Sequence, residues 1–127
     1  MSRVRPHGDI QVTLLTIFRS GPYGTAAGQE GLDAVLAAAA LDLNVSLLLQ
    51  DDAVFLLKRD QHSREDCKNY TKAFAALDDF GVEKIYIDKR SLAARGLELD
   101  DLLISPLVVD DADIEGIIAS ANNVFVY

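Results

Sequence analysis

Apolar positions in this chain follow two patterns, one typical of strands and one of helices. Five short stretches are almost continuously apolar or rich in β-branched residues, as in strands covered on both faces. They are residues 10–18, 45–49, 82–87, 104–109 and 124–127. Pro106 interrupts the fourth stretch, which favours an edge position or a late start at Leu107 because proline has no amide hydrogen for a sheet ladder.

Between these strands, apolar residues recur every three or four positions, as on one face of a helix. Two such stripes are Leu32, Val35, Leu36, Ala39 and Ala40, and Cys67, Tyr70, Phe74 and Leu77. The first predicts a helix capped by Thr25, and the second predicts a longer helix that begins near Ser63 and ends near Gly81. One short helical turn is expected between the two helices, directly after Asp51 and Asp52.

Two further helices are predicted in the last third of the chain. A polar segment at 88–91 leads into a short helix that closes at Arg95 and Gly96. Asp110 is placed to cap the last helix, whose inward residues are expected to be Ile114, Ile117, Ile118 and Ala121. Strands separated by helices pair in parallel through right-handed crossovers. The sequence therefore predicts a single-domain α/β fold, a doubly wound (Rossmann-like), five-stranded, mainly parallel sheet flanked by helices.

The length of 127 residues is that of one domain. Residues 1–9 are too polar for the apolar region of a signal peptide, so we expect a flexible N-terminal arm at 1–9 and an α/β domain at 10–127. No stretch approaches about 18 uninterrupted apolar residues, which predicts no membrane partner. A single cysteine cannot form an internal disulfide, and this favours a reducing, cytoplasmic location.

The formal net charge of −8 is unevenly distributed. The first eight residues carry Arg3 and Arg5 and no acid, whereas the rest of the chain has 10 basic against 20 acidic side chains. Binding to RNA or DNA phosphates depends on clustered Lys and Arg. The composition therefore argues against direct nucleic-acid binding by the folded body.

In a sheet of this class, ligands bind beyond the carboxyl ends of the strands. The loop after the first strand has glycines at positions 21, 24, 28 and 31 but no GxGxxG or Walker pattern. A structural turn is the favoured interpretation, with a phosphate cradle or a partner-binding loop as alternatives. The acids Asp51, Asp52, Asp88 and Asp110 follow three strands, and they suit either a Mg²⁺ site or, more simply, turns and helix caps. We predict no metal and no cofactor.

Cys67 is the only thiol in the chain. Its place on the second helical stripe predicts burial as a small hydrophobic residue, and the neighbouring Glu65 and Asp66 oppose a thiolate. His7 and His62 have no partner at metal-ligand spacing. We assign neither histidine a role.

Several segments together resemble a known family. They are the loop GPYGT at 21–25, the helix EGLDAVLAAAALD, the segment LLLQDDAVFLL and the segment FGVEKIYIDKRSLAARGLELDDLL. In this order and spacing they resemble the DsrE/DsrF-like sulfur-relay family, and within it most of all the non-catalytic DsrF and TusC subunits. The resemblance extends from about Thr13 to Val126 and leaves out the N-terminal arm. No single motif in it is specific by itself.

The resemblance implies a parallel α/β subunit of a hetero-oligomer, with sister subunits of the DsrE/TusD and DsrH/TusB types that serve a small DsrC/TusE-type carrier. In this family the DsrE or TusD subunit holds persulfide on a cysteine in the loop after the strand that corresponds to 82–87. Counting back from Arg95 and Gly96, that position falls on Asp88. A carboxylate cannot store sulfane sulfur, which needs a thiolate. The resemblance therefore implies a structural subunit with no catalytic residue, in tRNA 2-thiouridine synthesis or in sulfur oxidation.

Subunit contacts are expected at two loops, and the candidate residues are Tyr23, Gly24, Thr25, Asp88, Lys89, Arg90 and Ser91. A surface made for a related partner also allows the chain to form a homo-oligomer when it is alone. Two alternatives remain open. One is a sulfurtransferase that uses Cys67, and the other is a stand-alone anion-binding or Mg²⁺-binding module that uses the four acids.

Overall fold

The computed structural model describes residues 12–22, 26–59, 70–82 and 84–127. Its five-stranded sheet has the order β4-β3-β2-β1-β5, and every neighbouring pair is parallel. The strands are β1 (Thr13–Phe18), β2 (Asn44–Leu49), β3 (Lys84–Asp88), β4 (Leu107–Val109) and β5 (Asn123–Val126). The predicted α/β class is confirmed.

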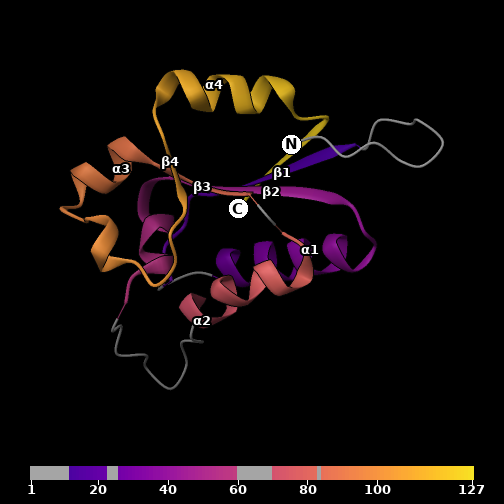
Figure 1. The fold of residues 1–127 in the computed structure, drawn as a ribbon, viewed down its shortest axis with the longest axis horizontal. Helices are drawn as coiled ribbons and strands as arrows, with labels where there is room; N and C mark the ends of the chain where they lie inside the picture. Colours follow the sequence, from indigo (N-terminus) through magenta and orange to yellow (C-terminus); the bar gives the residue numbers. More distant parts are fainter. Residues whose placement is uncertain (1–11, 23–25, 60–69, 83) are drawn as a thin grey trace.

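Helices cover both faces of the sheet. Figure 1 shows the sheet nearly edge-on, with α4 on one side and α1 and α2 on the other. The α-helices are α1 (Ala27–Ala40), α2 (Tyr70–Ala75), α3 (Lys89–Ala94) and α4 (Asp111–Ser120). Three 3₁₀ helices in the described chain are η1 (Asp51–Leu57), η2 (Ala76–Phe80) and η3 (Leu99–Asp101). No helix within these described residues is long and apolar enough to cross a membrane.

The two faces of the sheet bury very different amounts of apolar surface. The larger core lies on the side of α1 and α2, where Phe18 and Phe74 are almost fully buried and their rings meet edge to face at 5.3 Å. The smaller cluster lies under α4, and its buried members are Leu15, Ile17, Leu48, Val109 and Ile114. The face under α4 is therefore only partly filled by its single 10-residue helix.

The strand predictions are confirmed with shifts at their ends. β1 begins at Thr13, while residues 10 and 11 lie outside the described residues. β3 begins at Lys84, and Val82 is buried before the strand starts. β4 begins at Leu107 and occupies one edge of the sheet. Both expected effects of Pro106 are thus confirmed.

Two helix starts differ from the prediction or lie outside the described residues. The N-cap of α1 is Ala26, which makes no side-chain capping hydrogen bond, so the predicted cap at Thr25 is wrong by one position. Thr25 itself is not described, and neither is the predicted start near Ser63. The second helix is described from Tyr70, tightens to 3₁₀ geometry after Ala75 and ends at Gly81, where φ is 87°. That left-handed conformation is typical of a glycine that ends a helix.

Two further corrections concern the last third of the chain. The segment 88–91 is the end of β3 and the first turn of α3 rather than a loop before a helix. Ile118 is 41% exposed, so it does not point inward as predicted. The buried stripe of α4 runs instead through Ile114 and Ile117 to Ala121, and Ile118 lies beside that stripe.

The cap of α4 is confirmed. Asp110 Oδ1 accepts a hydrogen bond from the Asp113 amide at 2.8 Å, and Asp113 Oδ2 accepts one from the Asp110 amide at 3.2 Å, which makes a reciprocal capping box. The backbone hydrogen bond from Asp113 lowers the pKa of Asp110 below its ordinary value of 3.8, because it favours the ionised form.

This lowered pKa predicts a pH-dependent contribution to stability. The contribution of Asp110 is full above the unfolded value of 3.8 and is lost as the pH falls through the lower folded pKa. The variant Asp110→Ser keeps a capping oxygen that does not titrate. As the pH falls below 3.8, we expect the native chain to lose more stability than this variant. Thermal unfolding of both proteins over an acidic pH series measures it, and a constant difference would contradict the prediction.

Candidate functional site

The carboxyl edge of the sheet gathers the acids that the sequence singled out. Asp51 and Asp52 open η1 directly after β2, Asp88 ends β3, and Asp110 follows β4. Arg19 follows β1 at the same edge. This is the edge at which doubly wound sheets bind ligands, so its chemistry decides what the described part of the chain can do there.

Asp88 is the centre of a buried hydrogen-bond network. It is 7% exposed, and its Oδ2 accepts a hydrogen bond from the Ser91 hydroxyl at 2.6 Å, while Oδ1 accepts one from the Arg90 amide at 3.3 Å. Ser91 Oγ in turn accepts a hydrogen bond from the Asp51 amide at 2.8 Å. Asp88 therefore caps α3 and, through Ser91, links β3 to the turn after β2.

Asp51 has the backbone conformation that this link requires. Its φ of 53° lies in the left-handed region, which aspartate tolerates better than most residues. The turn formed there starts η1 and accompanies the amide contact with Ser91. The prediction that Asp51 and Asp52 form a turn is confirmed, but the helical segment begins at Asp51 and not after Asp52, and it runs for seven residues.

Three ion pairs surround this network. Arg19 Nε lies 3.0 Å from Asp51 Oδ2, and a guanidinium nitrogen of Arg95 lies 3.0 Å from Asp52 Oδ1. Arg90 pairs with Asp111. Most of these side chains are exposed, so each pair contributes only about 0–1 kcal/mol to stability. Their main effect is to oppose each of these carboxylates with a cation.

The ion pairs bear on the alternative of a Mg²⁺ module. Within the described ranges, no group of three or more His, Cys, Asp and Glu side chains is placed to hold a metal ion. Asp51 and Asp52 face arginines, while Asp88 and Asp110 cap helices. Sequence reasoning missed Arg19 and Arg95 as partners because they lie 32 and 43 residues from the acids that they contact, and only the parallel pairing of strands brings them together.

The candidate contact residues divide into three groups. Lys89 and Arg90 have exposed side chains at the start of α3, whereas Asp88 and Ser91 are buried inside the chain. Tyr23, Gly24 and Thr25 lie outside the described residues, and so does Cys67. Of the two predicted contact segments, the one at 88–91 is described. Its exposed side chains, which a partner can reach, are those of Lys89 and Arg90.

We expect Asp88→Ala to lower the free energy of unfolding by about 1–2 kcal/mol, because it removes the cap of α3 and leaves the buried Ser91 hydroxyl without its acceptor. The matched variant Asp88→Asn keeps an acceptor oxygen and is expected to lose less than half as much. Urea unfolding followed by circular dichroism measures both values. Equal stability of Asp88→Ala and the native chain would show that the network does not hold this edge together.

The chain is a doubly wound α/β protein whose sheet is parallel throughout, and the described part of its carboxyl edge is closed by helix caps and ion pairs. The residue at the end of its third strand is a hydrogen-bonded carboxylate.

The chain belongs to the DsrE/DsrF-like family, whose model matches residues 13–127. It is 38% identical to a TusC homolog from Vibrio vulnificus over 106 residues, which are 83% of this chain and 90% of that protein. It is 43% identical to the intracellular sulfur oxidation protein DsrF from Allochromatium vinosum over 86 residues, which are 67% of this chain and 63% of that protein.

The fold is shared with a solved structure of low sequence identity. The crystal structure of the ychN protein from E. coli superposes with a TM-score of 0.78, covers 92% of this chain and 99% of its own, and is 21% identical in sequence. This likeness concerns the fold alone. The family resemblance that the sequence segments predicted is confirmed.

Proposed function

We propose that this chain is a structural subunit of a sulfur-relay complex and does not itself carry sulfur. The observation that carries the proposal is Asp88, which stands where the family resemblance puts the sulfur-carrying cysteine. The residue is 7% exposed, and its carboxylate accepts a hydrogen bond from the Ser91 hydroxyl at 2.6 Å. Persulfide chemistry needs an accessible thiolate, and this position offers a buried carboxylate engaged in capping a helix.

The similarity to relatives named TusC homolog and intracellular sulfur oxidation protein DsrF favours a complex of related subunits. In this proposal the chain assembles with sister subunits of the DsrE/TusD and DsrH/TusB types in the cytoplasm. A sister subunit bears the persulfide and passes it to a carrier of the DsrC/TusE type. The reaction served is tRNA thiolation or sulfur oxidation, and relatives from both groups are similar to this chain.

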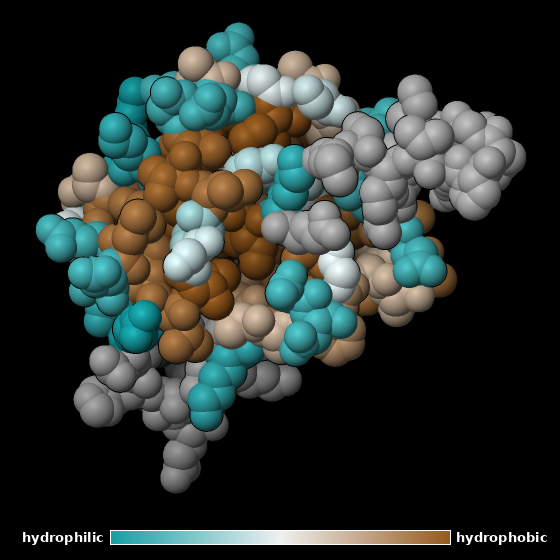
Figure 2. Space-filling view, in the orientation of Figure 1, coloured by the Kyte–Doolittle hydropathy of each residue, from teal (hydrophilic) through white to brown (hydrophobic). Residues whose placement is uncertain are grey.

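Both edges of the sheet carry exposed apolar side chains. On β5, Val124, Phe125 and Val126 are 39%, 49% and 57% exposed. On β4, Leu107 and Val108 are 52% and 39% exposed, and Figure 2 shows hydrophobic side chains gathered over this part of the molecule. Proteins normally protect sheet edges with charges or cover them, and large apolar patches mark interaction sites. Two apolar edges suit a subunit that has two neighbours.

Co-expression with the two candidate sister subunits, followed by native mass spectrometry, tests the assembly. We expect one complex that contains all three chains. A chain that stays alone or pairs only with itself in the presence of both sisters would contradict the proposal.

Incubation of the complex with a persulfide donor and intact-mass measurement of each chain tests the division of roles. We expect the gain of one sulfur atom, about 32 Da, on a sister subunit and not on this chain. A sulfur adduct on Cys67 that passes to a carrier would instead establish the alternative of a sulfurtransferase. The variant Cys67→Ser is the matched control, and it is expected to leave transfer by the complex unchanged.

A further inference from the structure

The sheet face beneath α4 carries polar side chains where a doubly wound sheet is normally apolar. Because side chains alternate along a strand, Asn44 and Ser46 of β2 share the face of Leu48 under α4. The register pairs Ser46 with Lys84 and Leu48 with Tyr86, so the polar positions continue onto β3. Central parallel strands are usually apolar on both faces. The amino half of this face therefore departs from what the fold alone requires.

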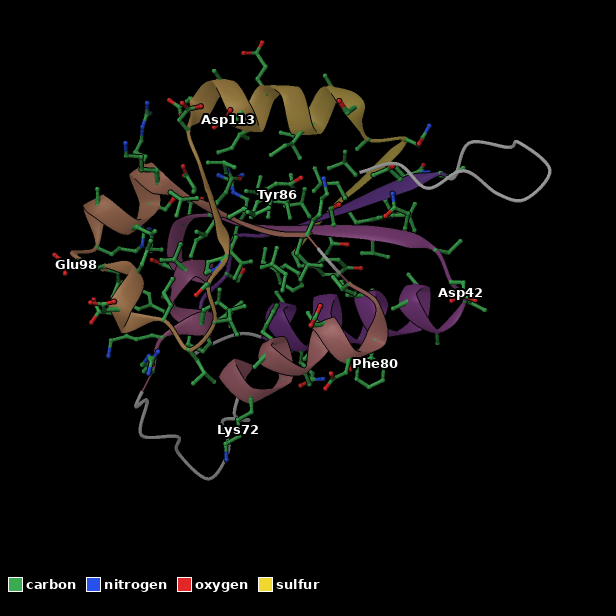
Figure 3. All side chains as sticks on the ribbon, viewed as in Figure 1. Asp42, Lys72, Phe80, Tyr86, Glu98 and Asp113 are labelled. Atoms are coloured by element: carbon green, nitrogen blue, oxygen red, sulfur yellow. The ribbon has the colours of Figure 1, made fainter. Side chains whose placement is uncertain are left out.

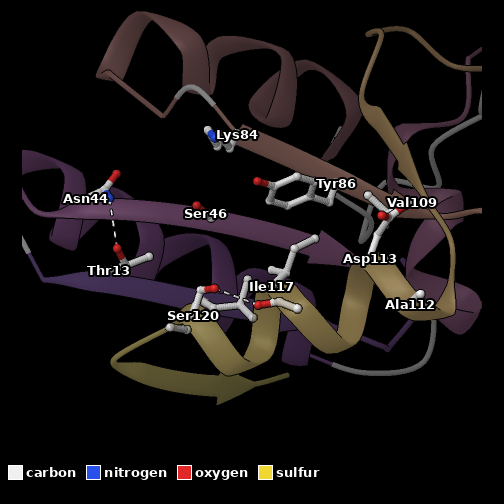
Figure 4. Close-up of a pocket in the computed structure, with 13 residues that line it drawn as sticks. Thr13, Asn44, Ser46, Lys84, Tyr86, Val109, Ala112, Asp113, Ile117 and Ser120 are labelled. Carbon is white, nitrogen blue, oxygen red and sulfur yellow. Dashed lines mark hydrogen bonds between the residues drawn. The ribbon is translucent and has the colours of Figure 1, made fainter. Parts of the chain in front are cut away.

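The helix above these residues does not fill the space over them. A cleft of about 700 Å³ remains between α4 and the sheet, and Asp113, Gly116, Ile117 and Ser120 line its helix side (Figure 4). A Cβ atom added at Gly116 would meet no atom within 4 Å. Cavities of this size commonly hold small molecules. Figure 3 shows Tyr86 and Asp113 on the α4 side of the sheet, away from Lys72 and Phe80.

Hydrogen-bond donors of the cleft gather on its sheet side. Figure 4 shows Lys84, Ser46 and the Tyr86 hydroxyl near one another on the neighbouring strands β2 and β3. Asn44 donates a hydrogen bond to the Thr13 hydroxyl at 3.2 Å beside them. An ammonium and two hydroxyl groups form a suitable environment for an oxyanion.

The rest of the cleft is mostly apolar and has one acid. Leu15 and Val109 line it from the sheet, and Ile117 lines it from the helix. In Figure 4, Asp113 lies nearer to Val109 than it does to Lys84. One of its carboxylate oxygens accepts the capping hydrogen bond from the Asp110 amide. The cleft thus has the basic side chain of Lys84 on one side, where an anionic group would lie, and apolar side chains beside it.

We propose that this cleft binds a small organic anion, in which a carboxylate or sulfonate group is joined to a short apolar body. The oxyanion contacts Lys84, Ser46 and Tyr86, and the apolar body packs against Leu15 and Ile117. Lys84 and Ser46, which contact the oxyanion, lie in the amino halves of β3 and β2, whereas Asp88 ends β3 at the opposite edge. The proposal is therefore independent of the role of Asp88 in the sulfur-relay complex.

Heteronuclear NMR of the full ¹⁵N-labelled chain tests this, with benzoate and benzenesulfonate as probes and with neutral benzamide and cationic benzylamine as controls. We expect both anions to give saturable shift changes in the amides of β2 and β3 that border the cleft, at millimolar concentrations. Benzamide is expected to bind at least about tenfold more weakly, because it lacks the charge that pairs with Lys84. Benzylamine is expected to give no such changes.

Three variants locate the probe. Gly116→Leu puts a side chain into the open cleft and is expected to abolish the shifts, and Lys84→Met is expected to weaken binding about tenfold. Glu115→Leu, a matched change on the exposed side of α4, is expected to leave binding intact. Any one of four results would overturn the proposal. The first two are anion-induced shifts scattered over the surface, and shifts that persist in a folded Gly116→Leu protein. The other two are benzylamine binding as strong as benzoate binding, and full affinity in Lys84→Met.

Discussion

Gly31→Ala is expected to lower the free energy of unfolding by about 2 kcal/mol, whereas Gly116→Ala is expected to raise it by about 0.5–1 kcal/mol. Both glycines lie within α-helices, α1 and α4. Alanine is the better helix former at both positions by a similar amount. The opposite signs arise from what surrounds each glycine.

At Gly31 the helix comes close to two aromatic rings. A Cβ atom there would lie 2.5 Å from Cε1 of Phe18 and 2.9 Å from Cγ of Tyr127. Phe18 is 1% exposed and is packed against the Phe74 ring, so it cannot turn away without disturbing the core. At Gly116 a Cβ atom would meet nothing within 4 Å, so only the gain in helix propensity remains.

Urea unfolding of the native chain and both variants, followed by circular dichroism, gives the two differences under the same conditions. Gly31→Val adds two more carbon atoms at the same place and is expected to be more destabilising than Gly31→Ala. If both alanine variants were more stable than the native chain, α1 would not lie as close to Phe18 as the structure has it.

Features that depend on residues adjacent in the sequence could be predicted from the sequence. The late start of β4 follows from Pro106, which has no amide hydrogen to donate, and the end of η2 follows from Gly81, which adopts a left-handed φ. The cap at Asp110 follows from a carboxylate placed just before a helix. Each of these effects is decided within one turn of chain.

Features that depend on strand order could not be predicted in the same way. The contact between Ser91 and the Asp51 amide requires β2 and β3 to be neighbours with one register. The cleft under α4 also depends on that register, because only the pairing of Ser46 with Lys84 places their side chains on one face. Ile118 was expected to be inward, yet α4 packs on the sheet through Ile114, Ile117 and Ala121, and Ile118 is 41% exposed.

The second large effect is expected from charges placed at the two edges of the sheet, which should weaken subunit binding. Phe125→Asp on β5 and Leu107→Asp on β4 are each expected to weaken the contact with one neighbouring sister subunit by about a hundredfold. A charge buried without a partner in an apolar interface costs several kcal/mol, and about 1.4 kcal/mol corresponds to a factor of ten. Phe125 and Leu107 are 49% and 52% exposed in this chain, so their replacement should leave the fold intact.

Leu41→Asp is the matched control, because Leu41 is 73% exposed and lies at the C-terminal end of α1 rather than on a sheet edge. Native mass spectrometry of the three co-expressed chains reads out the result. Each edge variant is expected to lose one sister subunit and keep the other, while Leu41→Asp assembles fully. Full assembly by both edge variants would place the subunit contacts elsewhere on the chain. Loss of both sisters in a single variant would mean that the two edges do not bind separate neighbours, since the β4 and β5 edges lie at opposite ends of the sheet.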